Sequence, residues 1–286
     1  MSKIKIAELF YSIQGEGRHM GVPSVFLRTF GCNFRCAGFG MPRGNLSTEA
    51  DEIAKVAHMF NKYEELPLVS TGCDSYASWH PDFKDLSPML TIDAIVDRIL
   101  ELLPYNQWLD EHLVITGGEP LLGWQRAYSD LLGHHKMAEL RELTFETNGT
   151  QPLSEDFTKF LDENWYGDTT GVVGREITFS VSPKLSNSGE ARVDAIKPEI
   201  IVDYQKYGWT YLKFVIANYD DAEEAIQIAN MYREAGFNGP VYFMPVGGVE
   251  SVYSLNNRTV AELAMRKGVR YSDRLQVPLF KNEWGT

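Results

Sequence analysis

The chain has 286 residues, of which 44% are hydrophobic, and this balance predicts a globular protein with a sizeable core and excludes intrinsic disorder. Asp and Glu outnumber Lys and Arg by 39 to 27, so the net charge of −12 would repel nucleic-acid phosphates and favours a small-molecule substrate. No apolar run reaches the roughly 20 residues of a membrane span, and the N-terminal sequence lacks the apolar core of a signal peptide, so we expect a cytoplasmic protein.

Short β-rich runs alternate with helical patterns along most of the chain, as in α/β folds with a parallel sheet. We expect one domain over residues 1–286. A helix is predicted from Thr91, where apolar residues recur with a 3.6-residue period until Pro104 stops it, and another from about 220 to 235. Strands are predicted at 24–30, 112–116, 142–147, 177–181, 211–216 and 241–244.

Residues 37–72 interrupt this alternation, and we interpret them as an insertion. Proline, glycine and asparagine between positions 42 and 45 predict a loop. The segment from Thr48 to Asp51 then resembles a helix-opening capping box, and we predict a helix over 48–60. Apolar residues at 50, 53, 54, 57 and 60 would share one face of this helix, so we expect that face to pack against other parts of the protein.

Three cysteines, Cys32, Cys36 and Cys73, are the first candidates for a metal site. An odd number of cysteines is a poor disulfide framework, so these thiols are either ligands or buried side chains that pack as small hydrophobes. Cys32 and Cys36 follow the strand at 24–30, on the side where α/β barrels build sites. An iron–sulfur cluster held by three cysteines leaves one iron free to bind S-adenosylmethionine (SAM).

The histidines offer one further metal ligand. His80 lies seven positions after Cys73, so ligand chemistry alone also allows a zinc site of three cysteines and one histidine. The protein would then be a zinc-stabilised binding module. The other five histidines show no metal-binding spacing.

The order of the motifs resembles the radical SAM superfamily. The superfamily pattern is a Cys-x-x-x-Cys segment after the first strand, here residues 32–36, followed by a Gly-Gly-Glu-Pro segment after a later strand, here residues 117–120. Its third cysteine normally stands where this chain has Phe39. Cys73 carries the Asp-Ser and aromatic continuation of that motif, and removal of residues 37–72 would restore the spacing.

The chain resembles the 7-carboxy-7-deazaguanine synthase family more specifically. The family's N-terminal signature is similar to Phe-Tyr-Ser-Ile-Gln-Gly-Glu-Gly at 10–17, Gly-Val-Pro at 21–23 and Phe-Leu-Arg at 26–28. Its later motifs are similar to residues 116–120, 146–150 and 182–184. A Gly-Gly-Glu-Pro segment alone would be an ordinary loop, whereas five motifs in order are a specific match.

The resemblance implies an α/β fold, an incomplete (β/α) barrel, with the site at the C-terminal ends of the strands. It implies a [4Fe–4S] cluster, SAM and Mg²⁺ as cofactors of a lyase. The implied reaction contracts 6-carboxy-5,6,7,8-tetrahydropterin to 7-carboxy-7-deazaguanine with loss of ammonia, in queuosine-type 7-deazapurine biosynthesis. The implied partners are a second copy in a homodimer and an electron donor such as flavodoxin, with no nucleic acid and no membrane.

The same cysteine motif also begins radical SAM activating enzymes, which take a hydrogen atom from a glycine of a partner protein. Such an activating enzyme is therefore the alternative activity. The Gln-Gly-Glu-Gly segment and Arg28 favour the synthase.

The resemblance assigns roles to individual residues. The assigned residues are Cys32, Cys36 and Cys73 for the cluster, Ser75 for Mg²⁺, Gly72, Asp74, Gly118, Ser182, Pro183 and Lys184 for SAM, and Ile13, Gln14, Gly15, Arg28 and Thr116 for the substrate. Glycines at 117 and 118 would let the backbone approach the amino end of SAM.

Three of these assignments have a plain structural alternative. Arg28 would bind the substrate carboxylate, but a salt bridge to Glu16 or Glu119 would also satisfy a buried guanidinium. Ser75 stands where the family has a threonine, and it could instead be a turn or N-cap serine. Lys184, considered alone, would be a surface lysine.

Overall fold

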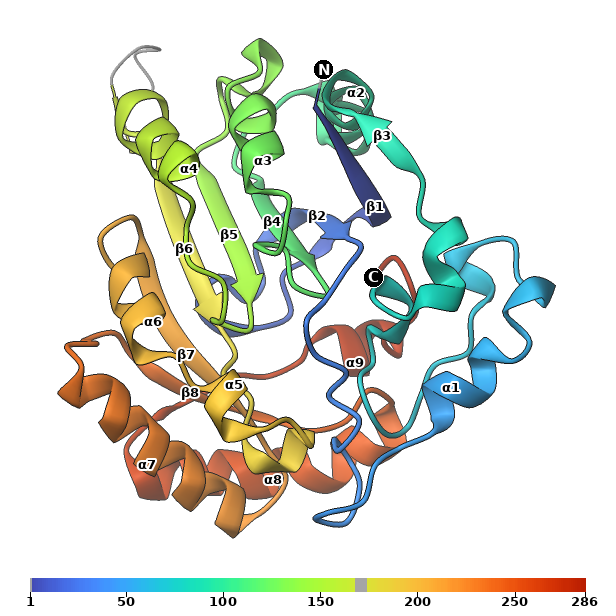
Figure 1. Cartoon of the computed structure of the whole chain (residues 1–286), viewed down its shortest axis with the longest axis vertical. Helices are drawn as coiled ribbons and strands as arrows, with labels where there is room; N and C mark the ends of the chain where they lie inside the picture. The colour runs from blue at the N-terminus through green and yellow to red at the C-terminus, as the bar shows by residue number, and fades with distance from the viewer. Residues whose placement is uncertain (1, 168–173) are drawn as a thin grey trace.

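A curved sheet organises the computed structural model, which describes residues 2–167 and 174–286 (Figure 1). In this part of the chain the sheet has nine strands in the order β3-β1-β2-β4-β5-β6-β7-β8-β9. The strands are β1 Lys3–Ile13, β2 Pro23–Thr29, β3 Met89–Thr91, β4 His112–Gly117, β5 Glu142–Thr147, β6 Glu176–Val181, β7 Trp209–Ile216, β8 Val241–Pro245 and β9 Arg270–Tyr271. All neighbours from β2 to β9 are parallel, whereas β1 runs antiparallel to β2 and β3.

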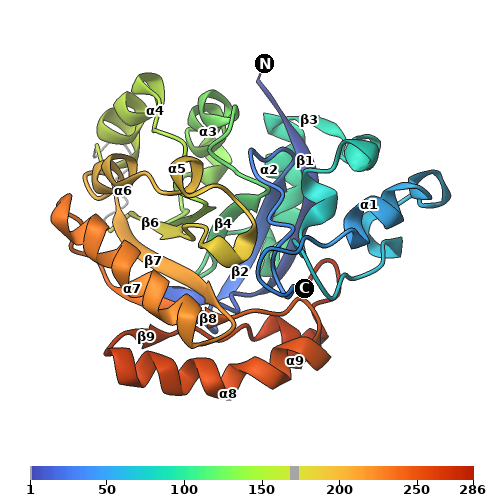
Figure 2. The ribbon, with the colours of Figure 1, turned by 60° about the horizontal axis from the view of Figure 1, so that its bottom comes forward.

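Helices cover the outer face of the sheet (Figures 1 and 2). The α-helices are α1 Glu49–Ala54, α2 Ile92–Leu102, α3 Gln125–Leu132, α4 Glu155–Phe160, α5 Arg192–Ala195, α6 Pro198–Tyr204, α7 Tyr219–Glu234, α8 Glu250–Lys267 and α9 Gln276–Phe280. Short 3₁₀ helices lie at Gly17–His19, Ala57–Met59, Tyr63–Glu65, Tyr76–Ser78, Pro81–Leu86, Pro104–Asn106, His135–Met137 and Ser186–Ser188, and a π-helical turn at Leu161–Trp165. No helix in the described residues is long and apolar enough to cross a membrane.

The expected α/β class and incomplete barrel are confirmed, because the two outer strands, β3 and β9, do not pair with each other. The six predicted strands are all present, and their bounds differ from the prediction by two residues at most. Strand β4 shows why they were visible in the sequence: a run of Leu, Val and Ile is buried on both faces, as parallel strands between the interior and a helix layer require.

The two predicted helices are confirmed as α2 and α7. The Thr91 hydroxyl accepts a hydrogen bond from the Ala94 amide at 3.3 Å and so begins α2. Ile92, Ile95 and Ile99 are buried on its inner face. The helix ends at Leu102, two residues before the proline that cannot continue it.

The insertion forms a loop around the short helix α1. The Gly72 amide donates to the Phe39 carbonyl at 2.7 Å, so the two ends of the insertion meet. The apolar face predicted for the helix packs on a second, smaller core that includes Tyr63, Tyr76 and Phe83. Its apolar periodicity was therefore a correct signal of packing.

Two details of the insertion differ from the prediction. Helix α1 spans only 49–54, and a 3₁₀ turn replaces its expected second half. The Thr48 side chain does not cap it, since Ser47 Oγ accepts from the Glu49 amide instead, at 3.2 Å. The Glu49 carboxylate instead accepts hydrogen bonds from Ser70 and Thr71 on the other side of the loop. The capping-box motif concerns only neighbouring residues and does not predict such a contact.

Two buried histidines lie at the N-terminal end of the parallel strands. The rings of His19 and His112 are 4.4 Å apart, and His112 Nε2 lies 2.7 Å from Thr144 Oγ1 on the neighbouring strand. Burial, with the nearby Arg18 charge, lowers the pKa of His19 to about 4, although a Glu142 oxygen lies 3.2 Å from its Nδ1. Burial also lowers the pKa of His112.

We expect acid to destabilise the fold through these rings. Between pH 6.5 and pH 4 these two histidines are protonated in the unfolded chain but remain neutral in the folded protein. The free energy of unfolding should therefore decrease as the pH falls through this range. Urea unfolding at several pH values measures the slope. His19→Gln should flatten it, whereas a change at the exposed His58 should not. A slope unchanged in His19→Gln would contradict this account.

Candidate functional site

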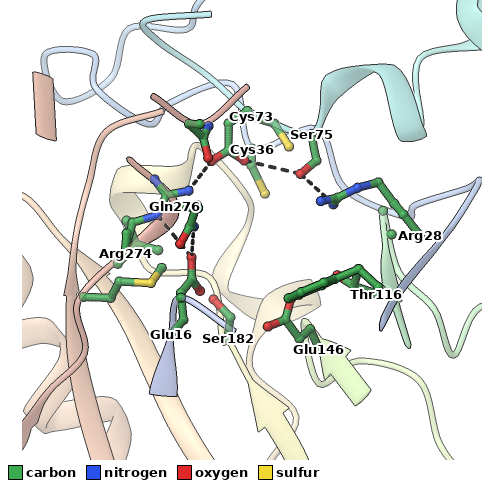
Figure 3. Close-up of a pocket in the computed structure, with 18 of the residues that line it drawn as sticks. Glu16, Arg28, Cys36, Cys73, Ser75, Thr116, Glu146, Ser182, Arg274 and Gln276 are labelled. Carbon is green, nitrogen blue, oxygen red and sulfur yellow. Dashed lines mark hydrogen bonds and ion pairs between the residues drawn. The ribbon is translucent and has the colours of Figure 1, made fainter. Parts of the chain in front are cut away.

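One cavity of about 250 Å³ collects residues from both ends of the chain (Figure 3). Every residue that the family resemblance assigned to a cofactor or substrate lines this cavity except Pro183. The strand order explains the convergence, because the parallel strands from β2 to β8 all direct their C-terminal loops to the same rim. Separate motifs of the sequence thus become one site.

The three thiols lie on one side of the cavity. Cys32 and Cys36 come from the loop after β2, and Cys73 comes from the segment that follows the insertion. Glu190 fixes the first loop, since its carboxylate accepts hydrogen bonds from the Cys36 amide at 2.7 Å and from the Arg35 amide at 2.9 Å. Cys36 has a positive φ of 50°, so this anchor stabilises a turn that a non-glycine residue disfavours.

The glycine pair after β4 packs directly under the cysteine loop. A Cβ atom on Gly118 would lie 2.4 Å from the Gly31 carbonyl oxygen and 2.7 Å from the Cys32 Cβ. One on Gly117, where φ is 149°, would lie 2.3 Å from the Thr29 carbonyl oxygen. Glycine is therefore required here for the close approach of two loops, in addition to the predicted approach of a cofactor.

Glu119 braces the same rim. This fully buried carboxylate accepts hydrogen bonds from the Leu121 amide at 3.0 Å, the Thr147 hydroxyl at 2.7 Å and the Asn148 amide at 2.6 Å. It joins the loop after β4 to the loop after β5. Both Glu119 carboxylate oxygens accept hydrogen bonds from these neighbouring groups, and Glu119 does not pair with Arg28.

Arg28 pairs with Glu8, a partner that residue spacing alone did not indicate. The Arg28 Nε lies 2.7 Å from a Glu8 carboxylate oxygen, and Nη1 donates to Ser75 Oγ at 3.1 Å. A salt bridge, which was the structural alternative for Arg28, is present, but both partners named for it, Glu16 and Glu119, are wrong. Glu16 is occupied elsewhere, as its contacts show.

A buried ion network surrounds Glu16 (Figure 3). Its carboxylate binds Lys213 of β7 at 2.5 Å and Arg274 at 3.2 Å, and it accepts a hydrogen bond from Gln276 Nε2 at 2.8 Å. Burial alone would raise the pKa of Glu16, but the two cations lower it to about 2. Arg274 also binds Asp74 at 2.5 Å, and this pairing lowers the pKa of Asp74 against the effect of burial.

Ser75 and Lys184 have side chains that point into the cavity. The Ser75 hydroxyl makes no cap to the turn that it precedes, and it lies between Arg28 and Asp74. Lys184 donates to Ser182 at 3.0 Å and lies 6.0 Å from the ring centre of Phe39, with no carboxylate partner in the described part of the chain. Ser75 thus lies in a turn, as its structural alternative required, but its side chain does not cap the following helix, and Lys184 is half-buried rather than a fully exposed lysine.

Glu146 is the acidic group on the opposite side from the thiols. Its two oxygens accept hydrogen bonds from Gln14 Nε2 at 3.2 Å and from Thr116 Oγ1 at 3.0 Å, and no cation among the described residues contacts it directly. Gln14 and Thr116 are predicted substrate contacts. Glu146 itself, like Glu8 and Lys213, was not among the predicted site residues.

The pattern of residues along the strands could have indicated Glu8 and Lys213 as site residues. Glu8 and Phe10 alternate on β1 as Phe26 and Arg28 do on β2, and the sheet register places Glu8 opposite Arg28. Lys213 is a single cation within a buried apolar strand, which calls for a partner. The partners themselves depend on register, which the sequence did not supply.

The thiols fit a cluster better than a single ion. Burial raises the pKa of Cys32 to about 12 and also raises those of Cys36 and Cys73, so the free thiols stay protonated and metal binding must displace protons. Within residues 2–167 and 174–286 no three His, Cys, Asp or Glu side chains are placed to hold one metal ion. A cuboidal cluster binds each cysteine at a different iron, which spreads its ligands more widely.

His80 is engaged away from the thiols. Its Nε2 lies 3.2 Å from Asp51 of α1, and its Nδ1 accepts from the Asp82 amide at 3.3 Å. It is absent from the cavity lining. The zinc site of three cysteines and His80 is therefore not supported.

An open barrel with three thiols at the C-terminal rim of its strands defines an enzyme of the radical SAM class. The chain belongs, within that class, to the 7-carboxy-7-deazaguanine synthase family. A 7-carboxy-7-deazaguanine synthase of Halobacterium salinarum is 30% identical over 294 residues, which cover 98% of this chain and 91% of the relative. One of Pyrobaculum aerophilum is 27% identical over 283 residues, with 99% and 97% covered.

A solved structure supports the fold. The crystal structure of QueE from Escherichia coli matches with a TM-score of 0.55 at 18% identity and covers 96% of this chain and 94% of that one. No family model matches the chain. The family assignment therefore comes from whole-length sequence similarity, and the structural match confirms the barrel architecture.

We expect Gly118→Ala to damage the rim. The added methyl group would collide with backbone and Cys32, and such overpacking costs about 1–3 kcal/mol. Thermal unfolding should show a lower Tm and reconstitution a lower iron content. Gly123→Ala is a control for backbone strain without collision: Gly123, unlike Gly118, has a positive φ of 85°, and its methyl would meet nothing within 4 Å. Equal iron content in both variants would show that the close approach at Gly118 is not needed.

Proposed function

We propose that this chain catalyses the radical SAM-dependent ring contraction of 6-carboxy-5,6,7,8-tetrahydropterin to 7-carboxy-7-deazaguanine, with loss of ammonia. The observation that carries the proposal is the convergence of the separate family motifs on one cavity, in a chain that aligns with a named synthase over 98% of its residues. The product would enter queuosine-type 7-deazapurine biosynthesis.

The cavity has two ends with different chemistry. Cys32, Cys36 and Cys73 would hold a [4Fe–4S] cluster at one end, which with bound SAM supplies abstraction of a hydrogen atom from the substrate. Lys184, a cation with no carboxylate partner among the described residues, faces that end, where a SAM carboxylate would lie. Gly72, Asp74, Gly118 and Ser182 line the space between.

The other end suits a carboxylated pterin. Arg28 uses Nε for Glu8 and keeps its terminal nitrogens toward Ser75 and the cavity, where they would bind the substrate carboxylate. Thr116, Gln14 and the Glu146 carboxylate present acceptors and donors for the polar edge of a pterin. These residues would orient the substrate carbon against the radical source and exclude water.

Ser75 is the proposed Mg²⁺ contact. A cation at its hydroxyl would lie beside the Arg28 guanidinium, which donates to the same oxygen. Coulomb repulsion opposes that arrangement unless an anion lies between the two positive charges. The carboxylate of the substrate would serve both cations, and Asp74 could supply a further oxygen.

The activating-enzyme alternative has less support. Residues 282–286 line the cavity together with Leu68 of the insertion, so segments of this chain occupy the side where a partner protein would have to enter. A small molecule suits such a cavity better than the main chain of a partner protein. We further propose a cytoplasmic homodimer that receives electrons from a flavodoxin-like donor, as the family resemblance implies.

Product analysis tests the proposed reaction. Anaerobically reconstituted protein with SAM, Mg²⁺, a reductant and 6-carboxytetrahydropterin should yield 7-carboxy-7-deazaguanine by mass spectrometry. Heat-inactivated protein is the control. Cleavage of SAM to 5′-deoxyadenosine without a deazapurine would remove the substrate assignment and leave the radical SAM class.

Substitution of Cys73 tests the third cluster ligand. The insertion separates Cys73 from Cys36 in sequence, yet its ends meet at Phe39 and Gly72, so the loop places Cys73 beside the others. Loop closure adds only about 0.6 kcal/mol per doubling of loop length. Cys73→Ala should lose iron and SAM cleavage as severely as Cys32→Ala. A brown, active Cys73→Ala protein would refute the assignment.

A further inference from the structure

Glu8 occupies a place that the antiparallel pair β1 and β2 determines. The register sets Glu8 directly opposite Arg28, and the next pair on the same face, Phe10 and Phe26, stacks with ring centres 4.9 Å apart at an angle of 7°. All four side chains line the cavity. The sheet therefore fixes the backbone of Glu8 directly opposite that of Arg28, and both side chains leave the strands on the cavity side.

The Glu8 carboxylate divides its two oxygens between two groups. Oε2 binds Arg28 Nε at 2.7 Å, and Oε1 accepts a hydrogen bond from the Gly285 amide at 3.0 Å. The Glu8 side chain is 7% exposed, so little water is available to replace either partner. One buried carboxylate thus joins the guanidinium to a segment that lies 277 residues further along the chain.

That segment, residues 282–286, is here called the C-terminal strap. Trp284 Nε1 donates to the Leu66 carbonyl of the insertion at 2.9 Å, and the indole meets the rings of Tyr63 and Tyr76 edge-on at 5.6 and 5.8 Å. Asn282 donates to the Gly248 carbonyl at 2.8 Å. All five residues of the strap line the cavity, and the C-terminus lies beside the insertion in both ribbon views (Figures 1 and 2).

We propose that Glu8 is a positioning residue of the substrate site, which orients Arg28 with one oxygen and seats the C-terminal strap with the other. This inference rests on the proposed function, since it takes a carboxylated pterin as the ligand of Arg28. With Nε fixed by Glu8, the guanidinium presents its two terminal nitrogens to the substrate carboxylate as a fork. The same carboxylate keeps the strap closed beside that fork.

The chemistry of glutamine makes this double role testable. Glu8→Gln preserves the shape but offers one acceptor oxygen in place of two, so its NH₂ group must face either Arg28 Nε or the Gly285 amide, donor against donor. Either choice breaks one of the two contacts. Glu8→Asp keeps both oxygens and the charge but withdraws them by one methylene, so it should have a smaller effect.

The experiment compares two ligands in reconstituted enzyme. The KM for 6-carboxytetrahydropterin should rise about tenfold in Glu8→Gln, the equivalent of 1.4 kcal/mol, while the Kd for SAM stays unchanged. A tetrahydropterin without the 6-carboxylate, used as an inhibitor, should bind wild type and Glu8→Gln equally. Glu101→Gln on the exposed face of α2 is the matched control and should leave all values unchanged.

Two further measurements separate positioning from a general structural role. Hydrogen exchange should quicken in a C-terminal peptide that contains the strap when Glu8 is replaced. The effects of Glu8→Gln and Arg28→Lys on KM should be less than additive in the double variant, because both act on the same contact. If Glu8→Gln does not fold, Glu8→Asp is measured with the same pair of ligands.

Distinct results overturn the inference and the proposed function. An unchanged KM in Glu8→Gln, or an equal loss of affinity for the two pterins, would show that Glu8 is only a structural ion-pair partner. Wild-type enzyme that neither binds nor converts 6-carboxytetrahydropterin would instead remove the proposed function, before any variant is compared.

Discussion

The buried carboxylate of Glu16 is the contact on which the site depends, because the sheet of this protein does not close into a barrel. Glu16 lies on the segment after β1 and binds Lys213 of β7 and Arg274 after β9. The amide of the next residue, Gly17, donates to Ser272. A non-strand segment thus spans the gap of the open barrel, and its ion pairs connect the first strand to the last ones.

Three consequences follow from this closure. Arg274 is placed where it also holds Asp74, so the Cys73 loop is fixed from the far end of the chain. Gln14 is brought across the interior to Glu146 on β5. Charge balance is local, because Arg28, Lys213 and Arg274 each have an acidic partner in direct contact. Buried charges that are paired in this way cost far less than isolated ones.

The insertion and the rim use the same principle of bracing by carboxylates. Glu49 joins the two arms of the insertion, Glu190 holds the first cysteine loop, and Glu119 joins the loops after β4 and β5. In each case an acidic side chain accepts backbone hydrogen bonds that a loop would otherwise leave unsatisfied. These loops therefore have fixed positions although they contain little regular secondary structure.

The sequence by itself determined the α/β class, the strands and helices with clear periodicity, and the motifs that converge on the cavity. These features depend on local patterns and on strand polarity, which residue spacing reveals. Only the tertiary structure decided the partner of Arg28, the bracing role of Glu119, the network around Glu16 and the strap over the cavity. These depend on register and on contacts between residues far apart in the chain, and neither leaves a periodic trace in the sequence.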